Sequence, residues 1–199
     1  PDWLKYIAED RLEEAYEISS ATNAFPEVCG RVCPQDRLCE GNCVVEKAGF
    51  GSITIGSLEK HITETAWNNG WIKPITSDKN QNQKVAIIGS GPAGLAAATY
   101  LIEYGYEVEV FEKNDRIGGL MIYGIPNFKL DKSVVIRRSD WLKESGVIFH
   151  TNCEVGKDLS FEDLEKKFDA ILISTGVYKA RSLDLNTEKV SNSIPALEY

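Results

Sequence analysis

The chain has 199 residues, of which 43% are hydrophobic and 26% are charged, and its 30 acidic and 22 basic side chains give a formal net charge of −8. These fractions are typical of globular proteins and exclude wholesale disorder, collagen-like repeats and low complexity. The acidic balance argues against nucleic acid or an anionic membrane as the main partner. No apolar run reaches the ~18 residues that a membrane span needs. Because the first residue is Pro1 and no secretory segment follows it, we expect part of a longer, cytoplasmic chain.

The first part of the chain, residues 1–76, is predicted to be a helical domain rich in cysteine. Apolar side chains recur at helical spacing over residues 3–19, which predicts one helix there, and residues 55–68 show the same pattern. Between these helices, residues 29–51 contain too much Gly, Pro and Cys for regular structure to be expected.

Residues 77–83 are all polar and can bury nothing, so they are predicted to form an exposed linker. The remaining residues, 84–199, alternate between apolar strands and helical stretches. Such alternation with short loops predicts a parallel, doubly wound sheet, the Rossmann-like class of α/β domain. Strands are expected over residues 84–89, 107–112, 147–150 and 169–174, and helices over residues 93–103, 133–145 and 161–167.

A glycine-rich loop marks the start of this second part. Gly89, Gly91 and Gly94 are spaced as G-x-G-x-x-G directly after the first strand and at the start of a helix. Gly89 permits a tight turn, Gly91 lets the backbone approach a diphosphate, and Gly94 lets the helix pack closely on the strand. Glu112 ends the second strand about 20 residues further on, where a ribose hydroxyl needs an acceptor. The loop therefore predicts a dinucleotide site; the alternative is a glycine-rich turn that binds nothing.

Three features indicate which dinucleotide this loop holds. The carboxylate of Glu112 would repel a 2′-phosphate, which excludes NADP(H) here. A second glycine pair follows at Gly118 and Gly119, and the last predicted strand ends in Thr175-Gly176. In this order the three elements resemble the flavoproteins with two dinucleotide-binding domains, in which the first Rossmann unit holds FAD. The resemblance covers residues 84–178 and implies FAD rather than NAD.

Four cysteines lie within fifteen residues, at positions 29, 33, 39 and 43. Zinc usually takes cysteine pairs separated by two residues, and disulfides are uncommon inside cells. A Cys-Pro step in a dense cysteine run is typical of iron–sulfur ligation. The spacing alone favours iron–sulfur ligation and leaves zinc and disulfides as alternatives. Cys153 stands apart and is predicted to be a core or half-buried thiol.

The cysteine run, the later segment Ile53-Thr-Ile-Gly56-x-Leu-Glu59 and the flavin loop together closely resemble the small (beta) subunit family of NADPH-dependent glutamate synthase. Pro126 and Lys129 also match that family. The N-terminal region of dihydropyrimidine dehydrogenase shares the arrangement. The resemblance covers essentially the whole chain and implies a helical iron–sulfur domain followed by an incomplete Rossmann-like FAD-binding domain.

The resemblance also implies which residues hold the cofactors. It implies two 4Fe–4S clusters that share their ligands with an upstream cysteine group, while Cys29 matches a cysteine that is not a ligand. The implied metal ligands are Cys33, Cys39, Cys43 and Glu59. The expected FAD-binding residues are Gly89, Ser90, Gly91, Pro92, Ala93, Gly94, Glu112, Lys113, Gly118, Gly119, Leu120, Lys129, Val155 and Gly176.

The resemblance implies an electron-transfer module of an oxidoreductase. In the intact protein NADPH would reduce FAD, and the clusters would pass electrons to a large subunit that makes glutamate from 2-oxoglutarate and glutamine. The NADPH-binding domain is expected downstream of this chain, so the chain alone is expected to be inactive. No catalytic acid–base or nucleophilic residue is expected, because His61 and His150 are too few and too scattered. The alternatives are a pyrimidine-reducing or ferredoxin-linked transhydrogenase module, and a non-catalytic adaptor with the same fold.

Overall fold

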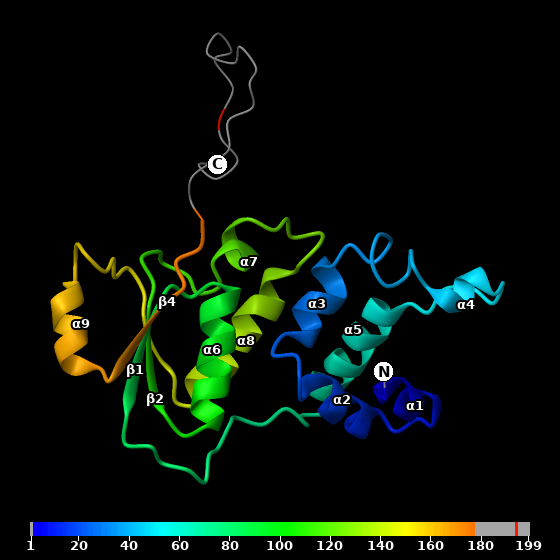
Figure 1. Ribbon diagram of the computed structural model, residues 1–199, viewed down its shortest axis with the longest axis horizontal. Coiled ribbons are helices and arrows are strands. Elements are labelled where there is room, and N and C mark those ends of the chain that lie inside the picture. The colour runs from blue at the N-terminus through cyan, green and yellow to red at the C-terminus, as the bar shows by residue number, and fades with distance from the viewer. Residues whose placement is uncertain (1, 178–193, 195–199) are drawn as a thin grey trace.

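The computed structural model describes residues 2–177 and residue 194. It consists of a helical part and a sheet-containing part that lie side by side (Figure 1). Within these described residues, no helix combines the length and apolar character needed to cross a membrane. Both parts of the predicted fold class are present: a helical cysteine-rich part and then an α/β part with a parallel sheet.

The chain begins with two helices where the sequence pattern predicted one. Helix α1 spans Trp3–Ala8 and helix α2 spans Leu12–Ser20. The break falls at Asp10, whose φ of 56° is left-handed and cannot continue a helix. Aspartate tolerates this conformation better than most residues. The apolar spacing continues across the break because both helices contribute to one small core with Trp3, Ala15 and Ile62 at its centre.

The cysteine-rich segment contains more regular structure than expected. Residues 29–51 were predicted to be irregular, and this is wrong at both ends of the segment. Helix α3 covers Pro26–Val32, with Pro26 in its first turn, and a short helix α4 covers Val44–Lys47. Proline suits the first turn of a helix because an N–H group at that position would have no acceptor within the helix. Helix α5, Ile55–Asn68, lies where it was predicted.

Two glycines let helices α3 and α5 cross closely. A Cβ atom on Gly30 would lie 2.7 Å from the backbone oxygen of Gly56 and 3.0 Å from the backbone nitrogen of Lys60. Gly56 is itself covered by the side chain of Gln35, whose amide donates to the carbonyl of Gly30 at 2.9 Å. This close crossing places the start of the cysteine segment firmly against α5.

The second part is a four-stranded parallel sheet in the order β3-β2-β1-β4, the order expected of a Rossmann-like fold. Val85 pairs with Val108 on one side of β1 and with Ala170 on the other. All four strands lie within the predicted ranges. Their bounds are β1 Lys84–Ile88, β2 Glu107–Phe111, β3 Ile148–His150 and β4 Ala170–Ile173.

The two faces of the sheet are covered differently. Alternate residues of β1 point to opposite faces: Ile87 joins the core beneath α6 and α8, and Ala86 joins the core beneath α9. Asp131 caps α8 and Ser160 caps α9, each by accepting a hydrogen bond from a backbone N–H in the first turn of its helix. A short helix, α7, was not predicted. The helices are α6 Pro92–Glu103, α7 Leu120–Tyr123, α8 Lys132–Glu144 and α9 Phe161–Lys167.

The two parts of the chain share one hydrophobic core. Phe25 from the helical part is buried in the same cluster as Ile87 and Leu142 from the sheet part. Residues 78–83 of the predicted linker are exposed, yet Gln81 is hydrogen-bonded to the backbone of Tyr104 and Gly105 after α6. The polar connection therefore runs along the surface of a continuous structure.

Candidate functional site

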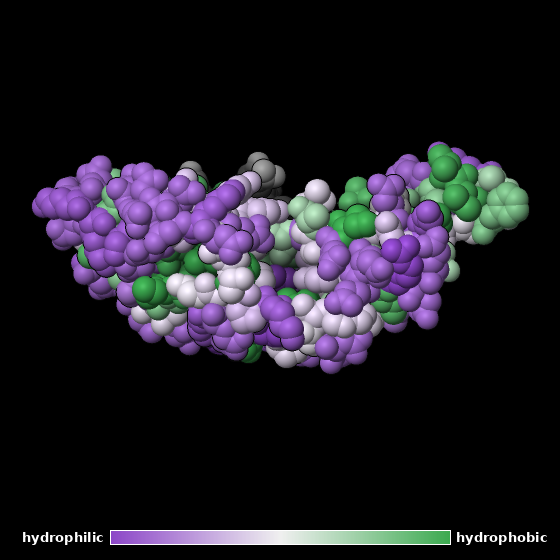
Figure 2. All heavy atoms as spheres, turned by 90° about the horizontal axis from the view of Figure 1, so that it is seen from below, coloured by the Kyte–Doolittle hydropathy of each residue, from purple (hydrophilic) through white to green (hydrophobic). Residues whose placement is uncertain are grey.

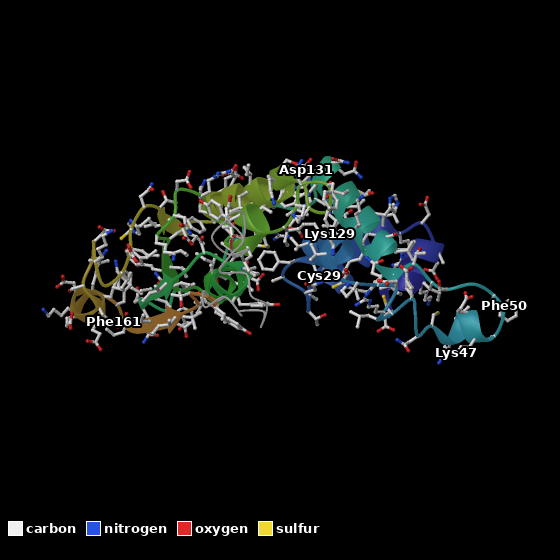
Figure 3. All side chains as sticks on the ribbon, turned by 90° about the horizontal axis from the view of Figure 1, so that it is seen from above. Cys29, Lys47, Phe50, Lys129, Asp131 and Phe161 are labelled. Atoms are coloured by element: carbon white, nitrogen blue, oxygen red, sulfur yellow. The ribbon has the colours of Figure 1, made fainter. Side chains whose placement is uncertain are left out.

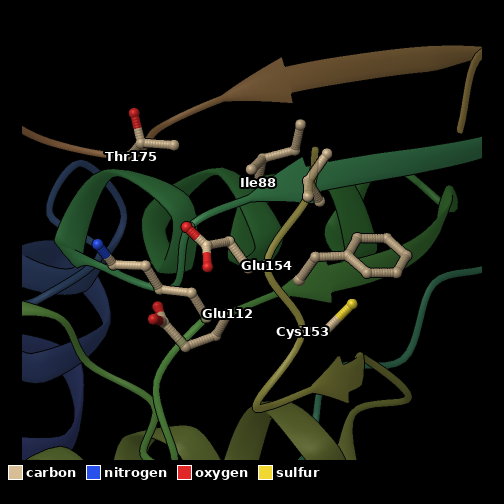
Figure 4. A pocket seen from close by; sticks show the side chains of 9 residues that line it. Ile88, Glu112, Cys153, Glu154 and Thr175 are labelled. Carbon is tan, nitrogen blue, oxygen red and sulfur yellow. The ribbon is translucent and has the colours of Figure 1, made fainter. Parts of the chain in front are cut away.

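Three loops meet at the carboxyl edge of the sheet, where ligands bind in open α/β folds. The first follows β1 and contains Gly89 to Gly91, the second begins with Glu112 after β2, and the third begins with Ser174 after β4. Figure 4 shows Glu112, Cys153, Glu154 and Thr175 around the hollow between these loops. Most of the candidate FAD-binding residues lie on or beside these loops, whereas Val155 follows β3 and Lys129 lies between α7 and α8.

The three glycines of the first loop are required for different reasons. Gly89 has a φ of 104°, and a Cβ there would lie 2.6 Å from the carbonyl oxygen of Ser174. A Cβ on Gly94 would lie 2.1 Å from the carbonyl oxygen of Gly89, so this glycine lets α6 pack against the strand. Gly91 has an ordinary φ of −67°, and no atom lies within 4 Å of where its Cβ would be.

Gly91 therefore leaves a space that the fold itself does not need. The space lies at the start of α6, where the N–H groups of the first turn lack partners within the helix and the helix dipole favours negative charge. A side chain at residue 91 would fill the position that the backbone offers to a diphosphate. The loop thus fits the diphosphate of a dinucleotide.

Glu112 is buried, with 5% of its surface exposed, and lies at the centre of a hydrogen-bond network. One carboxylate oxygen accepts from the backbone N–H of Ser90 at 3.0 Å and from its hydroxyl at 2.6 Å. The other accepts from the backbone N–H and the side-chain amide of Asn114, both at 2.9 Å. Glu112 lines the hollow, and it also ties the first two loops together.

The second glycine pair is attached to the same network. The backbone N–H of Gly118 donates to the carbonyl of Ser90 at 3.1 Å and to its hydroxyl oxygen at 3.2 Å. A Cβ on Gly119 would lie 2.8 Å from the Cα of Gly91, so the two glycine loops touch. The ammonium of Lys132 donates to the carbonyls of Met121 and Ile125 and so fixes the end of α7.

The hollow consists of two adjoining cavities of about 240 and 190 Å³ that share Gly89, Glu112 and Thr175. Most of the predicted FAD-binding residues line them. The larger cavity brings together Gly89, Gly91, Pro92, Ala93, Glu112, Gly119, Leu120 and Gly176, and the smaller one adds Lys113 and Val155.

Four of the predicted residues do not line these cavities. Ser90, Gly94 and Gly118 are buried behind the walls, where they shape the loops. Lys129 is exposed on the segment between α7 and α8. Sequence reasoning also left several wall residues out of the candidate list. These are Ile88, Phe111, Cys153, Glu154, Ser174, Thr175 and Val177. Thr175 belongs to the Thr-Gly turn that the sequence reasoning used, and no local motif marks the others.

The cysteine segment is anchored at one end and exposed at the other. Cys29 is partly buried against the shared core, whereas Cys33 and Cys39 are exposed and Cys43 is half-buried. Figure 3 shows Cys29 near the middle of the molecule and Phe50 at its far tip. Apolar side chains gather at that tip (Figure 2), among them the exposed Val44 and Phe50.

All five cysteines are free thiols, so the structure contains none of the disulfides considered as an alternative. Thiolates are the ligands that iron–sulfur clusters use, and the donor set fits such a group chemically. Within residues 2–177 the structure does not gather three or more Cys, His, Asp or Glu side chains into a metal-binding arrangement. The ligand assignment to Cys33, Cys39, Cys43 and Glu59 therefore stays a prediction.

Glu59 and Cys29 share a polar neighbour. Asn23 donates from its side-chain amide to a carboxylate oxygen of Glu59 at 2.9 Å, and its amide oxygen lies 3.7 Å from the sulfur of Cys29. Burial raises the pKa of both the Glu59 carboxyl and the Cys29 thiol. At the other end of the segment, hydrogen bonds from the backbone, that of Ile53 first, lower the pKa of the Cys43 thiol.

The fold and two family models define the chain as an iron–sulfur module joined to a dinucleotide-binding module. A family model described as dihydropyrimidine dehydrogenase domain II, 4Fe-4S cluster, matches residues 1–71. A second model, described as an NAD(P)-binding Rossmann-like domain, matches residues 87–135.

Curated relatives identify the family. The glutamate synthase (NADPH) small chain of Azospirillum brasilense is 57% identical over 100% of this chain and 41% of the relative. The protein of the same name from Escherichia coli (strain K12) is 44% identical over 100% of this chain and 42% of the relative. The chain belongs to the family of these glutamate synthase small chains, which are oxidoreductases. The names of these family models and relatives agree with the expected 4Fe–4S clusters, with a dinucleotide-binding domain and with NADPH, while FAD stays a prediction.

The chain spans about two fifths of the length of the curated relatives it matches. A solved structure of 2-naphthoyl-CoA reductase in complex with 2-naphthoyl-CoA has a TM-score of 0.51 and 19% identity, covering 94% of this chain and 28% of that chain. At this identity the likeness concerns the fold alone, which recurs there over nearly the whole chain.

The three glycines lead to a first prediction, which separates ligand binding from folding. Gly91→Ala should weaken FAD binding by about tenfold or more, because its methyl group enters the diphosphate space. The same change should alter the free energy of unfolding by less than about 1 kcal/mol. Gly94→Ala is the matched control and should cost about 1–3 kcal/mol of stability through overpacking. Flavin titration measures FAD binding, and urea denaturation measures the free energy of unfolding. Unchanged FAD affinity in Gly91→Ala would show that the space at Gly91 does not hold the diphosphate.

A second prediction concerns Glu112. Glu112→Ala should destabilise the ligand-free protein, at about 1–3 kcal/mol for each buried donor left unpaired, and should also weaken FAD binding. Glu154→Ala is the control, because Glu154 lines the same hollow but is exposed and pairs only with Lys157 among the contacts described. Urea denaturation without flavin reports the first effect, and flavin titration the second. Equal stability of the two variants would show that the Glu112 network does not hold the loops together.

Proposed function

We propose that the intact protein carries electrons from NADPH through FAD to 4Fe–4S clusters and on to a large partner subunit. That partner would use the electrons to make glutamate from 2-oxoglutarate and glutamine. The observation that carries the proposal is the open space at Gly91, which lies beside Glu112 in the larger cavity. Helix α3, which contains Cys29 and ends at Cys33, packs on the same hydrophobic core as this part of the chain. The dinucleotide site and this helix thus belong to one packed unit.

The residues of the chain would bind and orient the FAD. The start of α6 offers N–H groups to the diphosphate. The carboxylate of Glu112 lines the same cavity, and a ribose hydroxyl would replace one of its four present donors from Ser90 and Asn114. The backbone around Val155 and the side chain of Lys113 line the smaller cavity beside it. Bound FAD supplies two-electron uptake from a nicotinamide and one-electron release.

The cysteine segment would supply the thiolates for the clusters. We propose Cys33, Cys39 and Cys43 as ligands, with Glu59 as a further oxygen ligand. Cys29 faces the shared core and takes no part as a ligand in this scheme. The free thiols suit a reducing compartment, and the proposal includes a cytoplasmic location.

The proposed function is tested with the full-length protein purified without oxygen. Mixing with NADPH should bleach the flavin absorbance first and the broader iron–sulfur absorbance afterwards, and NADH serves as the comparison. Adding the large subunit, 2-oxoglutarate and glutamine should restore both absorbances and form glutamate. Absence of bound flavin or iron from the purified protein would overturn the proposal and favour a non-catalytic adaptor.

A third prediction tests the cluster ligands one at a time. Replacing Cys33, Cys39 or Cys43 with Ser should remove about one of the two clusters, and therefore roughly half of the bound iron and sulfide. Cys153→Ser is the matched control, and both it and Cys29→Ser should keep the full content. Iron and acid-labile sulfide analysis measures the result. Full iron content in any of the three ligand variants would remove that residue from the ligand set.

A further inference from the structure

A buried ion pair joins the cysteine-bearing helix to the dinucleotide-binding part. Glu27 in the first turn of α3 accepts two hydrogen bonds from Arg138 of α8, at 2.7 Å from Nε and 2.8 Å from Nη2. Glu27 is fully buried and Arg138 is 4% exposed. The guanidinium also lies over the rings of Trp141, Phe25 and Trp67, at 4.6 to 5.7 Å from their centroids. This two-pronged contact fixes both the distance and the orientation of the two helices.

Helix α8 contacts the dinucleotide site one turn before Arg138. A Cβ on Gly118 would lie 2.7 Å from a methyl group of Val135, so the second glycine loop rests directly on α8. The same helix therefore supports the FAD site through Val135 and holds α3 through Arg138. Helix α3 in turn contains Cys29 and ends at Cys33.

A second, less buried bridge follows the same route. Glu64 of α5 accepts from Arg31 of α3 at 2.9 Å and from the neighbouring Arg137 of α8 at 2.7 Å. The three helices α3, α5 and α8 are thus joined by two consecutive arginines of α8. The Glu27 pair is the more deeply buried of the two bridges.

A gain in the free energy of unfolding does not explain why this ion pair is buried. Desolvation of two charges offsets most of their attraction, and apolar residues of similar size often stabilise a protein equally well. A bidentate buried pair does impose a single geometry, because any displacement leaves a charge unpaired. Electron transfer rates fall steeply with distance, so a fixed separation between the flavin site and the thiols has functional value.

We propose that Glu27 and Arg138 are positioning residues that fix α3 against α8 and so set the distance between the FAD site and the clusters. This inference rests on the proposed function. Neither residue lines the hollow, and neither is among the proposed cluster ligands. Its loss should slow the passage of electrons between the two sites without affecting either site by itself.

The test uses the full-length holoprotein and the double variant Glu27→Leu/Arg138→Met, which replaces the pair with apolar groups of similar length. The rate of flavin reduction by NADPH and the flavin and iron contents should stay at wild-type values. The subsequent rate of cluster reduction should fall by about tenfold or more, as small misplacements do elsewhere. Hydrogen exchange of the backbone amides in α3 should accelerate. Mass spectrometry measures this exchange, and the measurement does not depend on either cofactor.

Lys143→Gln is the matched control, because it removes an exposed ion pair with Asp140 from the same helix. It should leave every rate unchanged. Arg138→Lys covers the case in which the double variant does not fold, since it keeps the charge but loses the two-pronged contact. A wild-type cluster-reduction rate and wild-type α3 exchange in a folded variant would overturn the positioning role. Absence of cluster reduction in the wild-type protein would instead overturn the proposed function.

Discussion

The hydrogen bonds between Ser90 and Glu112 hold the dinucleotide site together. Ser90 lies inside the first glycine loop, Glu112 directly follows β2, and Gly118 of the second glycine loop donates to Ser90. All three groups are buried, where an unpaired polar atom is costly, so the three segments can form only in this mutual arrangement. The cradle at Gly91 exists because this network fixes the loop on which it lies.

The same principle acts between the two parts of the chain. The connection at residues 77–83 is polar and mostly exposed, and by itself it would allow the parts to separate. Phe25 in the common core and the buried pair of Glu27 with Arg138 prevent this. The indole of Trp141 adds a hydrogen bond of 2.7 Å to the carbonyl of Lys73, just before the connection. The helical part is therefore oriented by side chains, and its peptide link contributes little.

The cysteine segment contrasts with both of these regions. Its first turn is anchored by α3, Gly30 and Asn23, whereas Leu38, Val44 and Phe50 further along are exposed apolar residues. The start of the segment is packed and the rest is exposed. This suits a segment that gains further contacts when a cluster or a partner binds to it. Helix α3 therefore positions the thiols of Cys29 and Cys33 at the start of the segment, but not those of Cys39 and Cys43.

The sequence by itself determined the strand and helix order and the glycine loop, because these depend on local periodicity and on what glycine permits. Other residues of the site wall, such as Lys113, Leu120 and Val155, were implied only by the family resemblance. Helix α5 and all four strands lie where the pattern predicted them. The tertiary structure decided the rest. The helix break at Asp10, the burial of Glu112 among four donors and the pairing of Glu27 with Arg138 involve conformations or partners that apolar spacing does not encode. Glu27 and Arg138 are 111 residues apart, and only folding brings their charges together, since each alone looks like an ordinary surface residue of an amphipathic helix.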